Sequence, residues 1–201
     1  MGRLYRLLYA VGLTPWEADA ERVAPELRTL MDRVEQSVER PLGAALDLGC
    51  GRGRWSRELA ARGWDVTGID VVPRAVQDAQ RRAEEWGVAV RFVQGSVTAL
   101  RDADVGTGYR LILDVECFNH LSDVQRAAVG REVDAVAGHD AQIVLLVWSR
   151  ARRGPLPPGA RREDVAAAFP RWRIVDETPY QAKLPPLMRS IRPRWYRLAR
   201  M

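Results

Sequence analysis

Three glycines and two carboxylates stand where strands of a parallel sheet could end. Residues 46–53 read LDLGCGRG, and Asp70 follows Gly49 by 21 positions. Glycine permits left-handed backbone dihedrals and lets a ligand approach the main chain closely. We expect Asp47 to supply an acceptor at the end of one strand, and Asp70 to accept both hydroxyls of a ribose at the end of the next. The pattern favours a nucleotide-like ligand.

The spacing of these glycines separates two kinds of nucleotide site. The dinucleotide fingerprint G-x-G-x-x-G/A needs glycine or alanine at position 54, which is Arg54. No strand is followed by a phosphate loop of the form G-x-x-x-x-G-K-[ST]. A chance glycine-rich turn is the alternative, and the acids at both expected strand ends argue against it.

A second chemical cluster reads Glu-Cys-Phe-Asn-His over residues 116–120. Glu116 and His120 are four apart, so in a helical turn both side chains lie on one face. His120 is one of two histidines, the other being His139. An unperturbed pKa of about 6.5 would suit His120 as a base at neutral pH.

The elements that position these residues alternate between strand and helix. Short apolar runs predict strands at 44–48, 66–70, 88–93, 109–115 and 143–148. Apolar periodicity predicts helices at 3–12, 17–34, 52–62, 73–86 and 123–137. Beyond the fifth strand we expect a loop at 150–160, a helix near 162–169, and strands at 172–177 and 194–198 around a proline-rich loop, 179–193. Regular alternation implies parallel pairing, hence a doubly wound, Rossmann-like α/β sheet.

The chain length is suited to one domain. We expect residues 1–40 to form an N-terminal helical cover and residues 41–201 the core. The apolar face of the second helix is expected to comprise Val23, Leu27, Leu30, Met31 and Val34.

The composition and charge of the chain indicate which classes of binding partner to expect. The net charge of +5 is uneven, because residues 150–201 carry 13 basic and 4 acidic side chains. Lys183 is the one lysine, so an arginine bias explains much of this excess, and a solvated surface is favoured over a nucleic-acid interface. No apolar run suits a membrane span, and Cys50 and Cys117 do not have metal-finger spacing. We expect a cytoplasmic protein with reduced thiols. The sequence does not decide between a monomer and a homodimer.

The segment ALDLGCGRGRWSRELAARGWDVTGIDVVPRAV resembles the first two motifs of the class I S-adenosylmethionine (SAM)-dependent methyltransferases. VRFVQGSVTAL resembles their third motif and YRLILDVECFNHLSD their fourth. The resemblance extends from about Ala44 to the C-terminus. It implies a seven-stranded sheet whose last inserted strand is antiparallel, SAM as cofactor and S-adenosylhomocysteine (SAH) as product.

The resemblance also implies which residues meet the cofactor. Asp47, Gly49 and Gly51 would hold its methionine part and Asp70 its ribose. The third motif often carries an Asp that meets the adenine amino group, and Ser96 stands there as a weaker acceptor.

Three further positions complete the expected cofactor site. We expect Val71 and Val97, which follow Asp70 and Ser96, to line it. The segment GLTPWE resembles a lid of thiol and thiopurine methyltransferase relatives, in which Trp16 would cover the cofactor. Packing of Trp16 on the core is the alternative.

A sulfonium is already an activated methyl donor, so the protein must mainly align the acceptor and exclude water. A hydroxyl acceptor also needs a base or a metal. Three interpretations of the cluster at 116–120 stay open: His120 as general base, Glu116 and His120 as part of a site for a divalent cation such as Mg²⁺, and His120 as a packing or capping group. Similar methyltransferases read E-x-x-E-H here, and Asn119 in place of the second Glu would weaken or rebuild such a cation site, which the sequence does not require.

The expected acceptor is a small molecule. In overall character the chain is similar to arginine-rich mycobacterial sugar O-methyltransferases, including the 1-O-methyltransferase of methylmannose polysaccharide synthesis. We therefore expect O-methylation of a sugar or other small hydroxyl compound, with a thiol as alternative. A nucleic-acid methyltransferase would carry an N/D-P-P-Y/F tetrad at 116–119, which this chain lacks. A SAM-binding module without catalysis is the last alternative.

Overall fold

The structure is a computed structural model that describes residues 15–150, 157–184 and 191–201, and it describes side chains from residue 21 onward. The helices are α2 (Pro15–Gln36), α3 (Arg54–Ala61), α4 (Pro73–Trp86), the short 3-10 helix η1 (Cys117–His120), α5 (Asp123–Val136) and α6 (Arg162–Ala168). The strands are β1 (Ala44–Leu48), β2 (Asp65–Asp70), β3 (Val90–Gln94), β4 (Tyr109–Val115), β5 (Ala137–Val147), β6 (Trp172–Pro179) and β7 (Arg194–Arg200).

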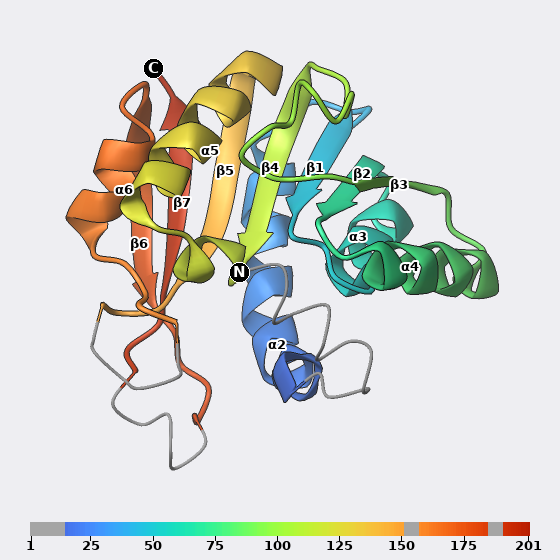
Figure 1. Ribbon diagram of the computed structural model, residues 1–201, viewed down its shortest axis with the longest axis horizontal. Coiled ribbons are helices and arrows are strands. Elements are labelled where there is room, and N and C mark those ends of the chain that lie inside the picture. The colour runs from blue at the N-terminus through green and yellow to red at the C-terminus, as the bar shows by residue number, and fades with distance from the viewer. Residues whose placement is uncertain (1–14, 151–156, 185–190) are drawn as a thin grey trace.

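The strands form one seven-stranded sheet in the order β3-β2-β1-β4-β5-β7-β6 (Figure 1). Strands β1 to β5 pair in parallel, and β7 pairs antiparallel with both β5 and β6. The predicted Rossmann-like sheet with an antiparallel last inserted strand is therefore confirmed.

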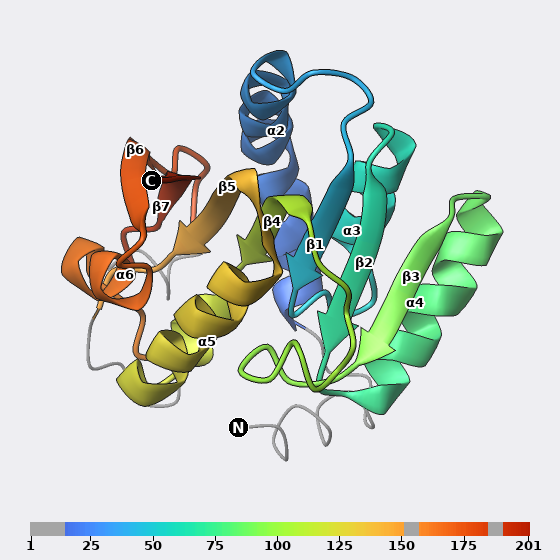
Figure 2. The same ribbon diagram turned by 90° about the horizontal axis from the view of Figure 1, so that it is seen from above.

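Helices cover both faces of this sheet (Figures 1 and 2). Helices α5 and α6 lie on one face, and α2, α3 and α4 lie on the other. Each face has its own buried apolar cluster. This layering leaves the carboxyl ends of the parallel strands as the edge at which loops can assemble a site.

Helix α2 packs on the sheet by the apolar face that the sequence predicts. Its buried side chains there are Val23, Leu27, Leu30, Met31 and Val34. They share a cluster with Trp55, Leu111, Leu146 and Trp195. The predicted helix at 3–12 and the side chain of Trp16 lie outside the described residues, so the cover over the site stays a prediction.

The predicted start of the fifth strand at Ile143 is wrong. A helix was expected over 123–137 and a strand only from 143, but α5 ends at Val136 and β5 begins at once with Ala137, which pairs with Tyr109. A Cβ on Gly138 would lie 3.3 Å from the carbonyl oxygen of Tyr109. The glycine thus lets the chain pass close to β4 instead of breaking away from it.

None of the described helices combines the length and the apolar composition that crossing a membrane would require.

Candidate active site

The site predicted from the glycine turn lies where the strand order reverses direction. From β1 the chain moves outward through β2 to β3, whereas β4 and β5 lie on the other side of β1. Ligands of open α/β sheets bind beyond the carboxyl ends of strands at such a reversal. The turn at residues 49–53 follows β1, and residues 116–120 follow β4, so the two chemical clusters of the sequence meet at this edge.

Asp70 ties the end of β2 to the glycine turn. Its Oδ2 accepts a hydrogen bond from the Gly51 N–H at 2.9 Å, and its Oδ1 accepts one from the Val72 N–H at 2.9 Å. Burial raises the pKa of Asp70, and the bonds from the Val72 and Gly51 N–H groups oppose that shift. The carboxylate is half-buried, at the position expected for a ribose acceptor.

Asp47 lies deeper, beneath the turn. It is 1% exposed and accepts a hydrogen bond from the Ser56 hydroxyl at 2.6 Å. Burial raises its pKa to about 6. The side chain therefore fastens the end of β1 to α3.

Gly49 brings the two clusters into contact. Its φ is +68°, and a Cβ there would lie 2.7 Å from Cβ of Cys117. Gly51 also has a positive φ, of 54°. The turn is thus a glycine-rich main-chain cradle in which a Cβ at Gly49 has no room, and bare glycine backbone suits the close approach of a ligand such as SAM.

The third predicted part of the cofactor site, after β3, also lies at this edge. The Gly95 N–H donates to the carbonyl oxygen of Asp70 at 3.0 Å, which brings the loop carrying Ser96 beside β2. The Ser96 hydroxyl lies 2.8 Å from that of Thr98. Val71 is 41% exposed and open to a ligand. The side chain of Val97 instead packs in the core.

Glu116 occupies a strained position after β4. Its φ of 78° is left-handed, which non-glycine residues rarely adopt. Its Oε1 accepts a hydrogen bond from Trp148 Nε1 at 3.2 Å, so the end of β5 orients the carboxylate. Strain of this kind often marks a functional position.

Asn119 fastens the same turn from inside. It is fully buried, donates to the Leu146 carbonyl oxygen at 3.2 Å and accepts from the Trp148 N–H at 2.8 Å. Both polar atoms of its side-chain amide are therefore bonded to the main chain at the end of β5. Across the described stretches of chain, no three His, Cys, Asp or Glu side chains gather to hold a metal ion.

His120 ends η1, with its ring centroid 6.3 Å from that of Trp148. Burial lowers its pKa to about 4. The expected value near 6.5 is therefore wrong, because the imidazolium loses hydration in this setting. His120 is neutral at physiological pH and a weak base.

Two buried charged residues near this turn were missed from the sequence. Asp114, on β4, accepts from the Phe118 N–H at 3.1 Å, and burial raises its pKa to about 7. Arg126, on α5, donates to the carbonyl oxygens of Phe118 and Gly159. A carboxylate inside an apolar strand was the available signal for Asp114, whereas nothing in the helical pattern distinguishes Arg126.

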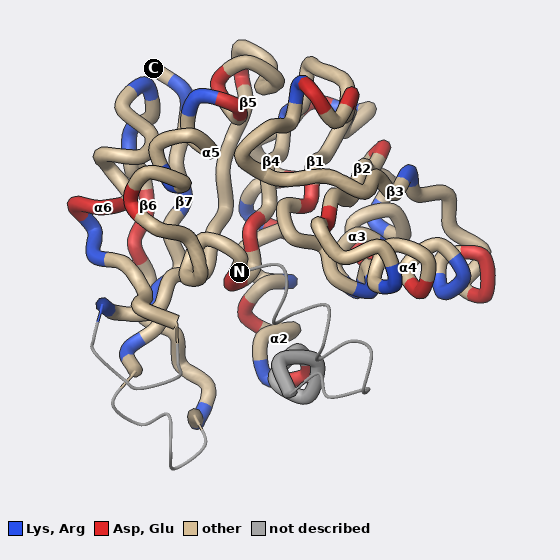
Figure 3. The backbone as a smooth tube through the Cα atoms, in the orientation of Figure 1, with Lys and Arg blue, Asp and Glu red and all other residues tan. Residues whose placement is uncertain are grey.

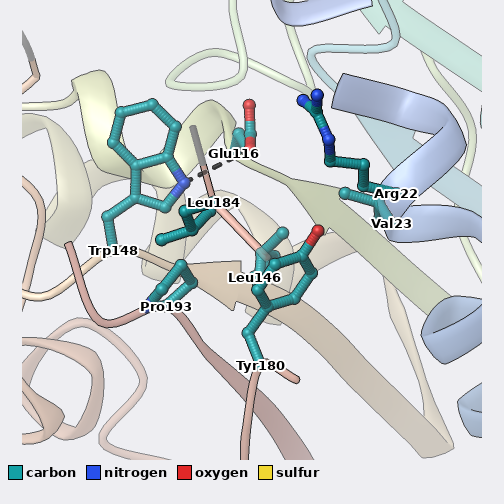
Figure 4. Close-up of a pocket in the computed structure, with 8 residues that line it drawn as sticks. All are labelled: Arg22, Val23, Glu116, Leu146, Trp148, Tyr180, Leu184 and Pro193. Carbon is teal, nitrogen blue, oxygen red and sulfur yellow. Dashed lines mark hydrogen bonds between the residues drawn. The ribbon is translucent and has the colours of Figure 1, made fainter. Parts of the chain in front are cut away.

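A recess opens beside Glu116 (Figure 4). Its empty volume is about 300 Å³, including the part open to solvent. The described residues that line it come from α2, the ends of β4 and β5, and the segment around β6 and β7: Arg22, Val23, Glu116, Leu146, Trp148, Tyr180, Leu184 and Pro193. Of these residues, only Glu116 was predicted from the sequence as part of a site, and the segment 179–193, which supplies Tyr180, Leu184 and Pro193, was expected only as a proline-rich loop.

Basic and acidic residues are interspersed along the described chain (Figure 3). In the C-terminal quarter Arg150 pairs with Asp123 at 2.9 Å, and Arg200 donates to the Ala137 carbonyl oxygen at 2.7 Å. Some of the excess basic side chains of this quarter therefore make contacts within the fold.

Comparison with known proteins agrees with this geometry. Residues 45–139 match the family described as methyltransferase domain. A ubiquinone biosynthesis O-methyltransferase from Azorhizobium caulinodans is 40% identical over 79 residues, which cover 39% of this chain and 30% of that protein. The chain spans about a third of the length of such curated relatives. These relatives do not show the expected resemblance to mycobacterial sugar O-methyltransferases.

Solved structures match over the whole sheet. The magnesium protoporphyrin IX methyltransferase from Synechocystis with bound SAH has a TM-score of 0.73 at 17% identity, and covers 100% of this chain and 99% of that one. A structure concerned with conversion of a disulfide bond into a thioacetal group during echinomycin biosynthesis has a TM-score of 0.72 at 21% identity, and covers 100% and 93%. At these identities the similarity establishes the fold.

Proposed function

We propose that this protein is a SAM-dependent methyltransferase that acts on the hydroxyl of a small acceptor. The main support is one juxtaposition: the glycine cradle and the Asp70 carboxylate lie at the reversal point of the sheet, and Gly49 packs against Cys117, the residue that follows Glu116. The methyltransferase-domain match over residues 45–139 supports the reaction class.

This arrangement supports the following roles for the residues that would hold the cofactor. Gly49 and Gly51 would let it approach the main chain, Asp70 would accept the ribose hydroxyls, and Val71 and Ser96 would lie against the adenine. Asp47 supports the turn from below, and Val97 contributes through its main chain. Trp16 would close over the cofactor.

When bound, SAM would supply a methyl group, already activated on a sulfonium, for transfer to the acceptor oxygen, with SAH as the other product. The protein holds the acceptor in line and removes its proton. Glu116 is the residue we assign to that proton, because its carboxylate lines the recess and Trp148 orients it. His120, with its low pKa, would act as a positioning residue packed beside Trp148.

The test is transfer of label from methyl-labelled SAM to a panel of small hydroxyl compounds. Wild-type protein should release labelled product and SAH in equal amounts. Glu116→Gln should lower turnover by about 10²-fold or more, the contribution of a positioned base, while SAH affinity stays the same. SAH binding without label transfer to any acceptor would favour a binding module, and full turnover by Glu116→Gln would remove Glu116 as the base.

A further inference from the structure

Arg126, on α5, carries a guanidinium that is buried beside the turn after β4. Its side chain is 2% exposed, and burial lowers its pKa. Removing a cation from water costs free energy, which hydrogen bonds and a nearby opposite charge must offset. An apolar side chain would fill a buried position on a helix without this cost. The bonds that the guanidinium makes therefore indicate what the position requires.

The guanidinium joins two segments that are far apart in the sequence. Its Nε donates to the carbonyl oxygen of Phe118, in η1, at 3.3 Å, and its Nη2 donates to that of Gly159 at 2.6 Å. Its Nη1 donates to Asp123 Oδ1 at 3.1 Å, and its Cζ lies 4.9 Å from the centroid of the Phe118 ring. The planar fork of donors suits two carbonyl groups at once, whereas a lysine ammonium is a compact charge without that fork.

Gly159 leads from this guanidinium to Trp148. A Cβ on Gly159 would lie 2.5 Å from the carbonyl oxygen of Trp148, so the two residues are closely packed. The next residue, Ala160, donates its N–H to the same oxygen at 2.8 Å. Trp148 in turn donates through Nε1 to Glu116 Oε1 at 3.2 Å. The guanidinium is therefore linked to Glu116 by one continuous series of contacts, besides its direct bond to η1.

We propose that Arg126 is a positioning residue that fixes the Glu116 carboxylate for removal of the acceptor's proton. It does so by holding η1 to Gly159 and thereby keeping Trp148 in place. The proposal rests on the proposed function, since it assigns a further residue to the same reaction. Glu116 stands on a left-handed backbone with φ of 78°, and such a conformation persists only where the surrounding structure holds it.

The cofactor side of η1 has a separate support. Asp114 Oδ1 accepts a hydrogen bond from the Phe118 N–H at 3.1 Å, and Cys117 packs against Gly49. Neither contact involves Arg126. Loss of the guanidinium should therefore lower turnover and leave SAH affinity unchanged.

The kinetic test uses Arg126→Lys, which keeps the positive charge and removes the fork. With an acceptor that wild-type protein methylates, turnover should fall by about ten-fold or more, since a small displacement of a positioned group costs a large factor in rate. The KM for SAM and the SAH affinity should stay at wild-type values. Arg131→Lys, on an exposed residue of the same helix, is the control and should change none of these.

A double variant shows whether Arg126 acts through Glu116. In the background of Glu116→Gln, Arg126→Lys should have almost no further effect on turnover, because the carboxylate that it positions is already gone. A residue that only stabilises the fold would lower turnover to the same extent in both backgrounds.

A spectrum of the indole N–H groups tests the same contact without an acceptor. In a proton–nitrogen correlation spectrum of SAH-saturated protein, the Trp148 Nε1–H peak is identified by its loss in Trp148→Phe. In Arg126→Lys this peak should move toward its position in Glu116→Ala, and in Arg131→Lys it should not move. Gly159→Ala, which crowds the Trp148 carbonyl oxygen and leaves the guanidinium intact, should move the peak as well.

An unmoved Trp148 peak in Arg126→Lys would overturn the proposal, as would wild-type turnover in that variant or an undiminished effect on top of Glu116→Gln. The proposed function fails in a different way. If wild-type protein methylates no acceptor but the peak moves, the contact that fixes Glu116 stands and the methyltransferase assignment falls. If methyl transfer occurs and the peak does not move, only the role of Arg126 is overturned.

Discussion

At the scale of single residues, the structure favours Glu116 over His120 as the base that the proposed function requires. Histidine is the usual base near neutral pH. Here burial lowers the pKa of His120 to about 4, while the carboxylate of Glu116 lines the recess on a backbone with φ of 78°. Residue type and spacing identified the pair, whereas the proposed choice of Glu116 as the base rests on the burial of His120 and on the hydrogen bond from Trp148 to Glu116.

The first prediction concerns the pH profile. Because His120 is already neutral near pH 6, its titration should not produce a rise in turnover between about pH 6 and 8. The profile of His120→Gln should have the same shape as that of the wild type over that range. Steady-state rates with a saturating hydroxyl acceptor measure this. A wild-type rise centred near 6.5 that disappears in His120→Gln would make His120 the base.

The candidate site was predictable from sequence to the extent that it rests on local motifs. Asp47, Gly49 and Asp70 could be found because glycines and acids recur at strand ends. Arg126, by contrast, bonds Gly159, which lies 33 positions further along the chain. No periodicity or spacing carries such long-range contacts, so its place beside η1 became visible only in the fold.

At the scale of elements, the turn after β1 and η1 fit together through Gly49 and Cys117. Gly49→Ala should destabilise the protein in two ways, because its φ is +68° and its new Cβ would lie 2.7 Å from that of Cys117. Gly87→Ala is the matched control, with φ of +67° and nothing within 4 Å. Both should lose about 1–2 kcal/mol of unfolding free energy from the backbone alone.

The excess loss in Gly49→Ala should appear in ligand binding as well. Displacing η1 from the glycine turn distorts the cradle, so SAH affinity should fall in this variant and stay unchanged in Gly87→Ala. Denaturant unfolding and SAH titration measure the two effects. If the variants behave alike in both measurements, the contact with Cys117 is not required for the site.

Most elements were predictable because propensity and packing agree. Residues 73–86 begin with proline and are followed by glycine, and α4 has these bounds. The start of β5 was missed because Gly138 has two uses: it can end a helix, or it can let two strands approach closely. Only the pairing of Ala137 with Tyr109 decides between them.

At the scale of the whole molecule, two carboxyls are buried in the sheet, one beneath the glycine turn and one beneath η1. Burial raises the pKa of Asp47 to about 6 and that of Asp114 to about 7. The folded state therefore binds more protons than the unfolded state, and the free energy of unfolding should fall as pH rises from about 4 to 7. For Asp114 alone the loss reaches up to about 4 kcal/mol.

Asp114→Asn should reduce that dependence. An amide oxygen can still accept from the Phe118 N–H, but it carries no charge, so the variant should gain stability relative to wild type as pH rises toward 8. Asp102→Asn, on an exposed residue, is the control. Urea unfolding at about pH 5 and 8 provides the comparison. An unchanged pH slope in Asp114→Asn would show that this carboxyl titrates normally in the folded protein.

The central claim, a SAM site built on the glycine turn and Asp70, is tested most directly by calorimetric titration with SAH. Wild-type protein should bind SAH with micromolar affinity and show no measurable affinity for NAD. Asp70→Ala should lose about 1.5–3 kcal/mol of SAH binding free energy, the range for hydrogen bonds to a charged group. Unchanged SAH affinity in Asp70→Ala, or micromolar NAD binding by the wild type, would contradict the account.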